Sequence, residues 1–426
     1  MNVPTDVRKE IPFHKNTVFM RTFVAHIFSS LGDWLDFIAL LTLFTYVWKA
    51  DVFLISALPV AYALPGILLS QAAGVWVDRL PPRQVLMYVD VLRSTCTLLL
   101  LCMPSPASVL CLVFIRAAIG VFHVPAQQLF IRRMVTADQL RKATGLIGTS
   151  FQLTKIIGPM LGSFVLALSS YKLCLLLTAG CLLLSVLLLF FLPVHDGSAS
   201  SKEAEPAAGF YAEWKAGWAT IFSLRIVLFC LLFSFIITTV IQIVDIQMAV
   251  LLRTIKPEQA ELPGWIISAI GLGAVCSTAY ITKQKKNIHY LLLLSSGSFL
   301  MGAAVLMFST FSEGTPVYYL LLAGGICGVG TGLSFISVQL SIQQEVPSQM
   351  LGRVYGIYHS IFHLLLIIAP LTGGWLVRLH GPHAVFRICG IAAITIGLCG
   401  FFLQKRLKAE QFHISETEER NTPSLL

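Results

Sequence analysis

Long runs of apolar residues alternate with short polar segments along the whole chain. Each run spans about twenty residues or more, the length that an α-helix needs to cross a bilayer. The runs are continuous and lack the alternation of barrel strands, which favours helices. The predicted fold class is therefore an all-α polytopic membrane protein. Its twelve predicted transmembrane helices lie near residues 22–47, 52–75, 84–103, 107–127, 145–169, 172–193, 226–251, 263–282, 288–309, 316–341, 354–377 and 384–403.

An internal repeat divides these spans into two halves. At an offset of 211 positions, residues 128–164 align with residues 339–375 and share twelve identities in 37 positions. Shared hydrophobicity does not explain identities at Gln128/Gln339, Pro159/Pro370 and Gly162/Gly373. Six spans return the chain to its starting side, so the halves have the same orientation. Parallel halves of this kind place a substrate cavity at their interface.

The predicted domains follow from the repeat. Residues 1–193 form an N-terminal six-helix bundle, and residues 225–403 form a C-terminal six-helix bundle. Residues 194–224 are predicted to be a cytoplasmic linker that is flexible at first and ends in a short amphipathic helix at the membrane surface. Residues 404–426 are predicted to be a cytoplasmic tail.

Basic residues are concentrated in one set of connections. Of the 30 Lys and Arg residues, 21 lie in the connections of one side and 6 in those of the other. The positive-inside rule then places both termini in the cytoplasm, which agrees with an even number of spans. Only 12% of the residues are charged, about half the share of a soluble domain. The net charge of +9 is better explained by loops that contact lipid than by nucleic acid binding.

Several motifs carry a resemblance to a known family. The loop Gly74–Arg83 reads G-x-x-x-D-R-x-x-x-R, and Arg116–Gly120 reads R-x-x-x-G. With twelve spans and two similar halves, these strings resemble the major facilitator superfamily. Asp90-Val-Leu-Arg93 and Gly158-Pro159-Met-Leu-Gly162-Ser163 are similar to motifs of its drug:proton antiporter branch, which includes macrolide and enterobactin-type siderophore exporters. Thr154 and Ser163 stand where the antiporter motif has glycines, a departure that weakens the inference of proton-coupled export.

The resemblance implies a transporter of the bacterial inner membrane that works by alternating access. The expected activity is proton-coupled export of an amphipathic organic solute, either a drug or a siderophore. Two alternatives keep the fold: a siderophore importer and a lysophospholipid transporter. The expected partners are this solute, protons and the lipid bilayer, and the expected state is a monomer.

Asp33 and Asp36 are the first candidates for the transport cavity. Asp33 is twelve residues beyond Arg21, or about 18 Å along a helix, which places it near the bilayer centre. Asp36 lies on nearly the same helix face. A carboxylate at that depth must face water, find a partner or hold a proton. We expect the two to carry the coupling proton or to contact a cationic substrate; the alternative is a buried ion pair with Arg93, Arg116 or Lys155.

Basic and acidic residues on other spans extend this candidate cavity. The basic candidates are Arg93, Arg116 and Lys155, of which Arg116 and Lys155 lie about mid-span. Arg116 remains charged, so it would hold a carboxylate that protonation releases, bind an anionic group of the substrate, or form a static pair with Asp33 or Asp90. Asp245, near the outer end of its span, would line the external mouth or cap a solvated helix end.

A cytoplasmic gate and two hinges complete the predicted machinery. In the gate, Asp78 would face the positive N-terminal end of the helix that starts at Gly352 and Arg353. The predicted gate residues are Gly74, Asp78, Arg79, Arg83, Asp90, Gly352 and Arg353. A proline within a spanning helix bends it, so the predicted hinge residues are Gly158, Pro159, Gly162 and Pro370.

No pattern for covalent or metal chemistry stands out in the sequence. It contains no G-x-x-x-x-G-K-[ST] phosphate loop, and no CxxC or Ser/His/Asp arrangement. His359 and His363 have the i, i+4 spacing of a metal pair but no third ligand at motif spacing. We therefore expect no enzyme activity, cofactor or metal. A membrane-embedded enzyme or sensor remains the alternative from another class.

Overall fold

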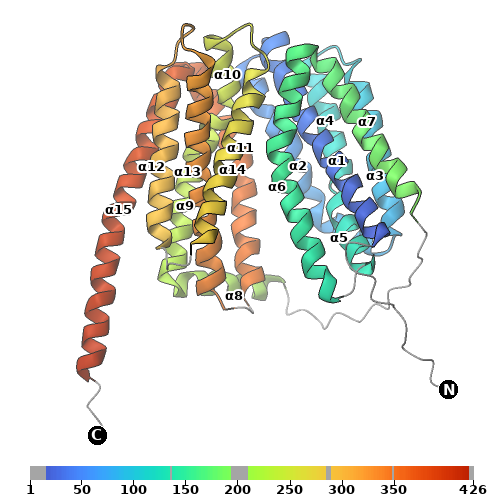
Figure 1. The fold of residues 1–426 in the computed structure, drawn as a ribbon. Coiled ribbons are helices and arrows are strands. Elements are labelled where there is room, and N and C mark those ends of the chain that lie inside the picture. The colour runs from blue at the N-terminus through green and yellow to red at the C-terminus, as the bar shows by residue number, and fades with distance from the viewer. Residues whose placement is uncertain (1–15, 135–136, 193–209, 285–288, 348–349, 422–426) are drawn as a thin grey trace, which may run out of the picture. The chain divides into compact units, whose positions relative to one another are not determined.

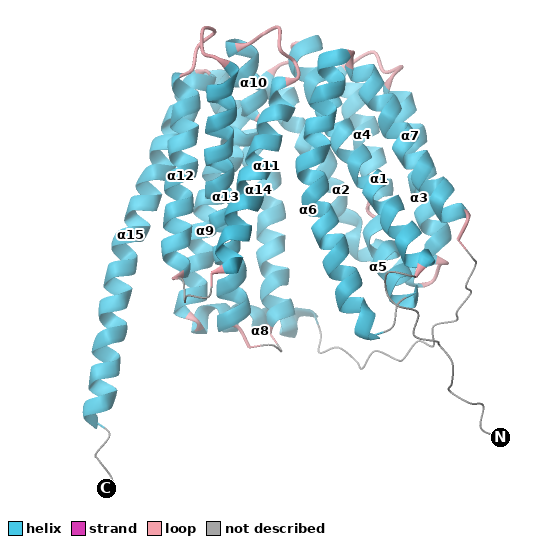
Figure 2. Cartoon of the chain, in the orientation of Figure 1, coloured by secondary structure: helices cyan, strands magenta, loops and turns pink. Residues whose placement is uncertain are grey.

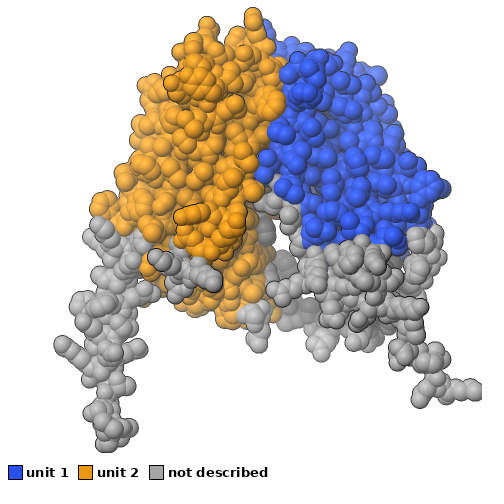
Figure 3. Space-filling model, in the orientation of Figure 1, with its two compact units in different colours: residues 1–50, 58–204 blue, residues 51–57, 205–426 orange. Residues whose placement is uncertain are grey.

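The computed structural model describes residues 16–134, 137–192, 210–284, 289–347 and 350–421. Some side chains within these ranges are left undescribed, mainly in 71–78, 132–152 and 210–217, at 352 and 359, and from 403 onward. The described residues fold into helices joined by short connections (Figure 2). They fall into two compact units, residues 1–50 with 58–204 and residues 51–57 with 205–426 (Figure 3).

Unit 1 contains the helices of the N-terminal half (Figure 1). The first helix, α1, is followed directly by a short π-helical segment, η2, and α4 is followed after a two-residue turn by α5. The elements are α1 (Thr17–Thr42), η2 (Leu43–Val47), α2 (Val52–Asp78), α3 (Pro82–Leu100), α4 (Pro106–Gly120), α5 (His123–Met134), α6 (Ala137–Leu168) and α7 (Tyr171–Phe190). The first turns of α2, up to Ala57, cluster with unit 2.

Unit 2 contains the helices of the C-terminal half (Figure 1). The predicted span 226–251 is broken at Ile246 into α9 and α10, and α8 lies where the amphipathic end of the linker was predicted. The elements are α8 (Phe210–Ser223), α9 (Arg225–Asp245), α10 (Gln247–Ile255), α11 (Leu262–Lys283), α12 (Tyr290–Thr310), α13 (Val317–Glu345), α14 (Leu351–His380) and α15 (Pro382–Asn421).

Ten helical segments of the described residues are long and apolar enough to cross a membrane, and Leu153–Leu168 within α6 is a shorter apolar helix. The predicted span 84–103 coincides with α3, which is outside the ten because it carries Arg83, Asp90 and Arg93. The all-α polytopic class is confirmed, whereas the number twelve stays a prediction.

Local sequence explains several helix ends. The Ser105 and Ser108 side chains form a capping box at the start of α4, and Pro106 occupies the first helical position, where its missing N–H costs nothing. At the end of α14, Gly381 has φ +77°, a conformation that glycine adopts without steric penalty. Pro382 then starts α15. These signals separate adjacent spans without long loops.

Candidate functional site

Unit 1 brings charged residues of α1, α3 and α4 together in its interior. Asp33 and Asp36 are three residues apart on α1, yet they bind different partners. Asp36 forms an ion pair with Arg116 of α4, and Asp33 forms one with Arg93 of α3. Both acids therefore have a guanidinium partner from a neighbouring helix. The sequence left open whether the two acids face water, hold a proton or pair with a buried base. In the structure, Asp33 pairs with Arg93 and Asp36 pairs with Arg116.

The Asp36–Arg116 pair is fully enclosed. The side chains of Asp36 and Arg116 are 0% and 3% exposed. Arg116 Nη1 donates to Thr97 Oγ1 at 3.1 Å, and the Tyr62 hydroxyl donates to the same Asp36 oxygen that Arg116 contacts. The guanidinium carbon also lies 5.6 Å from the centre of the Tyr62 ring, within cation–π range. Asp36 Oδ2 therefore accepts from two donors, whereas Asp36 Oδ1 is buried without a hydrogen-bond partner among the described residues.

The second pair, Asp33 with Arg93, differs in exposure. The Asp33 side chain is 49% exposed, whereas that of Arg93 is only 8% exposed. Arg93 Nη1 also lies 3.5 Å from Asp90 Oδ1 and donates to Ser29 Oγ at 3.3 Å. Arg93 thus lies between an accessible carboxylate and a buried one. Loss of the contact with Asp33 would leave it paired with Asp90.

Asp90 is held on several sides by polar groups. Ser185 Oγ of α7 donates to Asp90 Oδ2 at 2.7 Å, and Ser29 Oγ lies 3.4 Å from Oδ1. His123 Nε2 is 3.8 Å from the same Oδ1. Asp90 was predicted as a gate residue; the structure places it within this interior cluster, and its side chain is fully buried.

The cluster does not balance its charges. Three carboxylates (Asp33, Asp36 and Asp90) face two guanidiniums (Arg93 and Arg116). With every group ionised, the cluster carries one surplus negative charge. A net charge inside a membrane is costly, so this surplus would favour binding of a proton or another cation, or contact of the exposed Asp33 carboxylate with water.

The other two predicted cavity residues, Lys155 and Asp245, have exposed side chains. Lys155 on α6 is exposed, and among the described residues no carboxylate lies within ion-pair distance of it. Asp245, the last residue of α9, is also exposed. The structure therefore brings together four of the six predicted cavity residues: Asp33, Asp36, Arg93 and Arg116.

The structure describes only part of the predicted gate. The Asp78 side chain and the surroundings of Gly74 and Gly352 lie outside what the structure describes. Arg79 is exposed, and Arg83 donates from Nε to the Leu189 carbonyl at 2.9 Å, near the end of α7. Arg353 Nη1 is 3.4 Å from Met350 Sδ. The Asp78 contact stays a prediction.

The predicted hinge residues lie at close helix contacts. A Cβ at Gly158 would overlap the Trp34 side chain of α1, and one at Gly162 would lie 3.2 Å from Ile38 Cβ. Pro159 and Pro370 are both buried, and the Pro370 carbonyl oxygen is 3.5 Å from Gln247 Nε2. These positions let α6 and α14 approach the helices beside them.

Sequence reasoning missed Tyr62, Thr97, Ser29 and Ser185. Each lies in an apolar span, where a lone hydroxyl is unremarkable. One signal was available for Tyr62, which stands between Pro59 and Pro65 in an otherwise apolar run. His26 and His123 belong to no motif, and from sequence alone we expect core or lining residues; the structure places His123 Nε2 3.8 Å from Asp90 Oδ1.

Comparison with known proteins gives the family. The sequence model described as Major Facilitator Superfamily matches residues 22–370. The chain is 27% identical over 414 residues to the uncharacterized MFS-type transporter YfiS of Bacillus subtilis (strain 168), covering 96% of this chain and 99% of YfiS. It is 21% identical over 365 residues to the multidrug efflux pump Tap of Mycolicibacterium fortuitum, covering 82% and 87% of the two chains.

The fold agrees with this assignment. The crystal structure of a mutant of the nucleoside transporter NupG superposes with a TM-score of 0.70 at 13% identity, covering 91% of this chain and 99% of that one. An identity this low bears on the fold alone. The family match spans most of the chain, and the helical architecture is that of known transporters. The chain therefore belongs to the Major Facilitator Superfamily and is a multi-pass membrane transporter rather than an enzyme.

Proposed function

We propose that this protein is a proton-coupled exporter of an amphipathic organic solute in the bacterial inner membrane, with both termini in the cytoplasm. The family membership supports transport by alternating access. The similarity to the efflux pump Tap supports the outward direction. The substrate is a drug-like molecule or a siderophore.

The observation that carries the proposal is the Asp33–Arg93 ion pair. Arg93 is buried, but half of the Asp33 side chain is exposed. A carboxylate exposed to hydrocarbon costs several kcal/mol, on the order of 3, so its exposed side requires water or a polar ligand. Protonation of Asp33 would release Arg93 to Asp90, which lies 3.5 Å away. This change of partner is the expected proton-dependent step.

The two acids of α1 then have different roles. Asp36 is enclosed by Arg116 and Tyr62 and is expected to stay paired throughout transport. Asp33, with its accessible carboxylate, is expected to carry the coupling proton and to contact the substrate. The predicted latch at Asp78 would close the cytoplasmic side, and the bends at Pro159 and Pro370 would allow the helices to move.

The decisive experiment measures transport in inverted membrane vesicles with an imposed pH gradient. The probe is a panel of fluorescent amphipathic dyes and siderophores, each tested with and without the gradient. An exporter accumulates at least one probe inside inverted vesicles when their lumen is acidic. Asp33→Asn is expected to lower this gradient-driven accumulation at least tenfold, about 1.4 kcal/mol in transition-state free energy.

Asp51→Asn is the matched control. Asp51 is also an acid with about half of its side chain exposed (47%), and its ion-pair partner among the described residues is the exposed Arg378. Its Oδ1 accepts from the Phe53 N–H at the start of α2, a hydrogen bond that asparagine can keep. Its replacement should leave transport unchanged. Wild-type vesicles that take up no probe in either gradient direction would contradict the proposal. In whole cells, deletion of the gene should raise the intracellular level of an exported probe and lower that of an imported one.

A further inference from the structure

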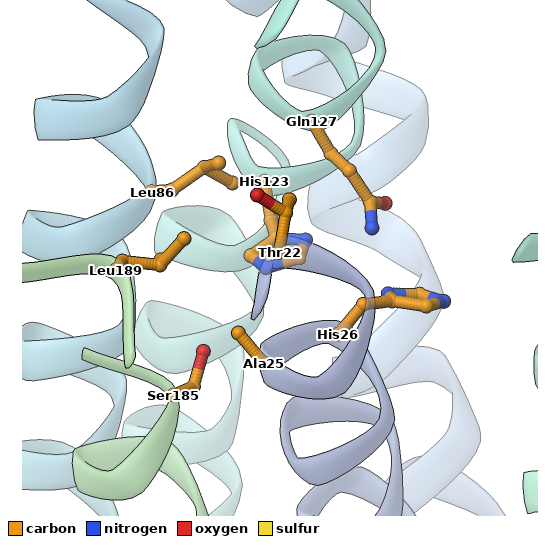
Figure 4. A pocket seen from close by; sticks show the side chains of 8 residues that line it. All are labelled: Thr22, Ala25, His26, Leu86, His123, Gln127, Ser185 and Leu189. Carbon is orange, nitrogen blue, oxygen red and sulfur yellow. The ribbon is translucent and has the colours of Figure 1, made fainter. Parts of the chain in front are cut away.

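A small cavity in unit 1 is lined by residues of α1, α3, α5 and α7 (Figure 4). Two of its lining residues, His123 and Ser185, face Asp90 of the charge cluster. Its volume is about 10 Å³, close to the smallest space that holds one water molecule. It is too small for an organic solute. Its polar lining consists of Thr22, His26, His123, Gln127 and Ser185.

The two histidines differ in their hydrogen bonding. Both ring nitrogens of His26 are buried, and neither has a hydrogen-bond partner among the described residues. His123 Nε2 faces Asp90 at 3.8 Å. A buried polar group without a partner is costly, which makes His26 a group that the packing alone does not explain.

Polar residues continue from this cavity to the accessible carboxylate. On α1, Thr22, His26, Ser29 and Asp33 recur at the helical spacing i, i+4, i+7 and i+11, so they share one face. That face spans about 16 Å along the helix axis. Ser29 contacts both Asp90 and Arg93 of α3. A polar route therefore runs from the cavity to the Arg93–Asp33 pair.

We propose that His26 and His123 form a proton-transfer site that connects the N-terminal end of α1, expected to be cytoplasmic, with Asp90. The proposal rests on the proposed function in one respect, that the coupling ion is a proton. The site supplies the charge that the cluster lacks, since one bound proton balances three carboxylates against two guanidiniums.

Imidazole is suited to this step. A neutral ring accepts a proton on one nitrogen and releases one from the other. A proton bound at His26 passes through the water-sized cavity to His123, and the His123 imidazolium gives it to Asp90 Oδ1. Both rings are then neutral and Asp90 is a carboxylic acid. Arg93 is left with Asp33 as its only charged partner.

The charged and titratable groups around the site are few. They are Asp33 on α1, Asp90 and Arg93 on α3, His26 on α1 and His123 on α5. The polar lining residue of α7 is Ser185, which carries no charge. A metal is an unsuitable occupant, because no group of three or more His, Cys, Asp or Glu residues able to hold one occurs in the described part of the chain.

The test records ring ¹⁵N spectra of histidine-labelled full-length protein in lipid bilayers between about pH 3 and 9. His26→Gln and His123→Gln assign the two signals. Both rings are expected to change charge in this range. Because interacting sites titrate together, His26→Gln should shift the midpoint of His123 by at least about half a pH unit. Asp90→Asn should shift that midpoint as well.

His383 provides the control. Its ring nitrogen contacts the Ser309 carbonyl at 3.1 Å in unit 2, so His383→Gln should leave both midpoints in place. The proposal is overturned if neither ring titrates in the wild-type protein, or if the His123 midpoint is the same with and without Asp90. The measurement needs no substrate. A failure of the dye transport assay would therefore count against the proposed function and leave this result standing.

Discussion

The two units resemble each other in packing and differ in charge. In unit 1, Gly162 of α6 lies against Ile38 of α1; in unit 2, the repeat-equivalent Gly373 of α14 lies against Ile243 of α9. Aligning these contact points makes Thr238 and Ile241 the counterparts of Asp33 and Asp36. The halves therefore keep the same close contact while only one of them carries acids at this depth.

Buried side chains extend the contrast. In unit 1 the buried set includes Asp36, Asp90, Arg93 and Arg116, whereas the described part of unit 2 buries serines and Gln247 but no charged residue. Unit 2 instead uses glycines at helix crossings, where a Cβ would meet the backbone of the neighbouring helix: Gly273, Gly302, Gly328, Gly330, Gly390 and Gly397. Small residues let helices approach closely in a membrane. The comparison shows that the buried charged residues of the described chain lie in unit 1, whereas unit 2 is packed closely through glycines.

The largest expected effect comes from breaking the enclosed pair of unit 1. Arg116→Gln should lower the free energy of unfolding by about 3–5 kcal/mol, because it leaves the Asp36 carboxylate buried without its cation. Unfolding in detergent micelles, followed by circular dichroism, measures this. The double variant Asp36→Asn/Arg116→Gln should recover part of the loss. A single variant as stable as the wild type would show that the pair is dispensable.

A smaller effect is expected from the glycine packing of unit 2. A Cβ at Gly328 of α13 would overlap the Ile270 carbonyl oxygen of α11. Gly328→Ala should therefore destabilise the protein by about 1–3 kcal/mol, the usual cost of overpacking. The same micelle unfolding assay applies.

Gly325, three residues earlier on the same helix, is the matched control. No atom of another group lies within 4 Å of a Cβ placed there. Gly325→Ala should be neutral or stabilising by up to about 1 kcal/mol, since alanine favours the helix. An equal decrease in the free energy of unfolding for Gly328→Ala and Gly325→Ala would contradict the role of close packing at Gly328.

The smallest effect is expected at the exposed ion pair between Arg378 and Asp51. Arg378 Nε is 3.9 Å from Asp51 Oδ2, and the side chains are 67% and 47% exposed. Arg378→Ala should change stability by less than about 0.5 kcal/mol, because water screens such pairs. Unfolding at low and high salt should give a difference that is no larger at high salt, because salt screens exposed charges further. A loss comparable to that of Arg116→Gln would contradict the distinction between enclosed and exposed pairs.

The apolar runs by themselves determined the helical membrane architecture, because only helices satisfy the backbone over twenty lipid-facing residues. The repeat identified the pairs Pro159/Pro370 and Gly162/Gly373. Helix rise alone predicts that Asp33 lies near mid-membrane, since the expected depth follows from position along one helix.

The tertiary structure decided which charges meet. Asp33 and Asp36 share a helix face, yet their partners Arg93 and Arg116 are 60 and 80 residues away in sequence. Periodicity tells which face a residue occupies but not which helix lies opposite. For the same reason Lys155, equally deep by its sequence position, stands outside the cluster, while Tyr62 and His123 lie within it. The expected depth of a residue in the membrane depends on its position along one helix, whereas its ion-pair partner depends on how several helices pack.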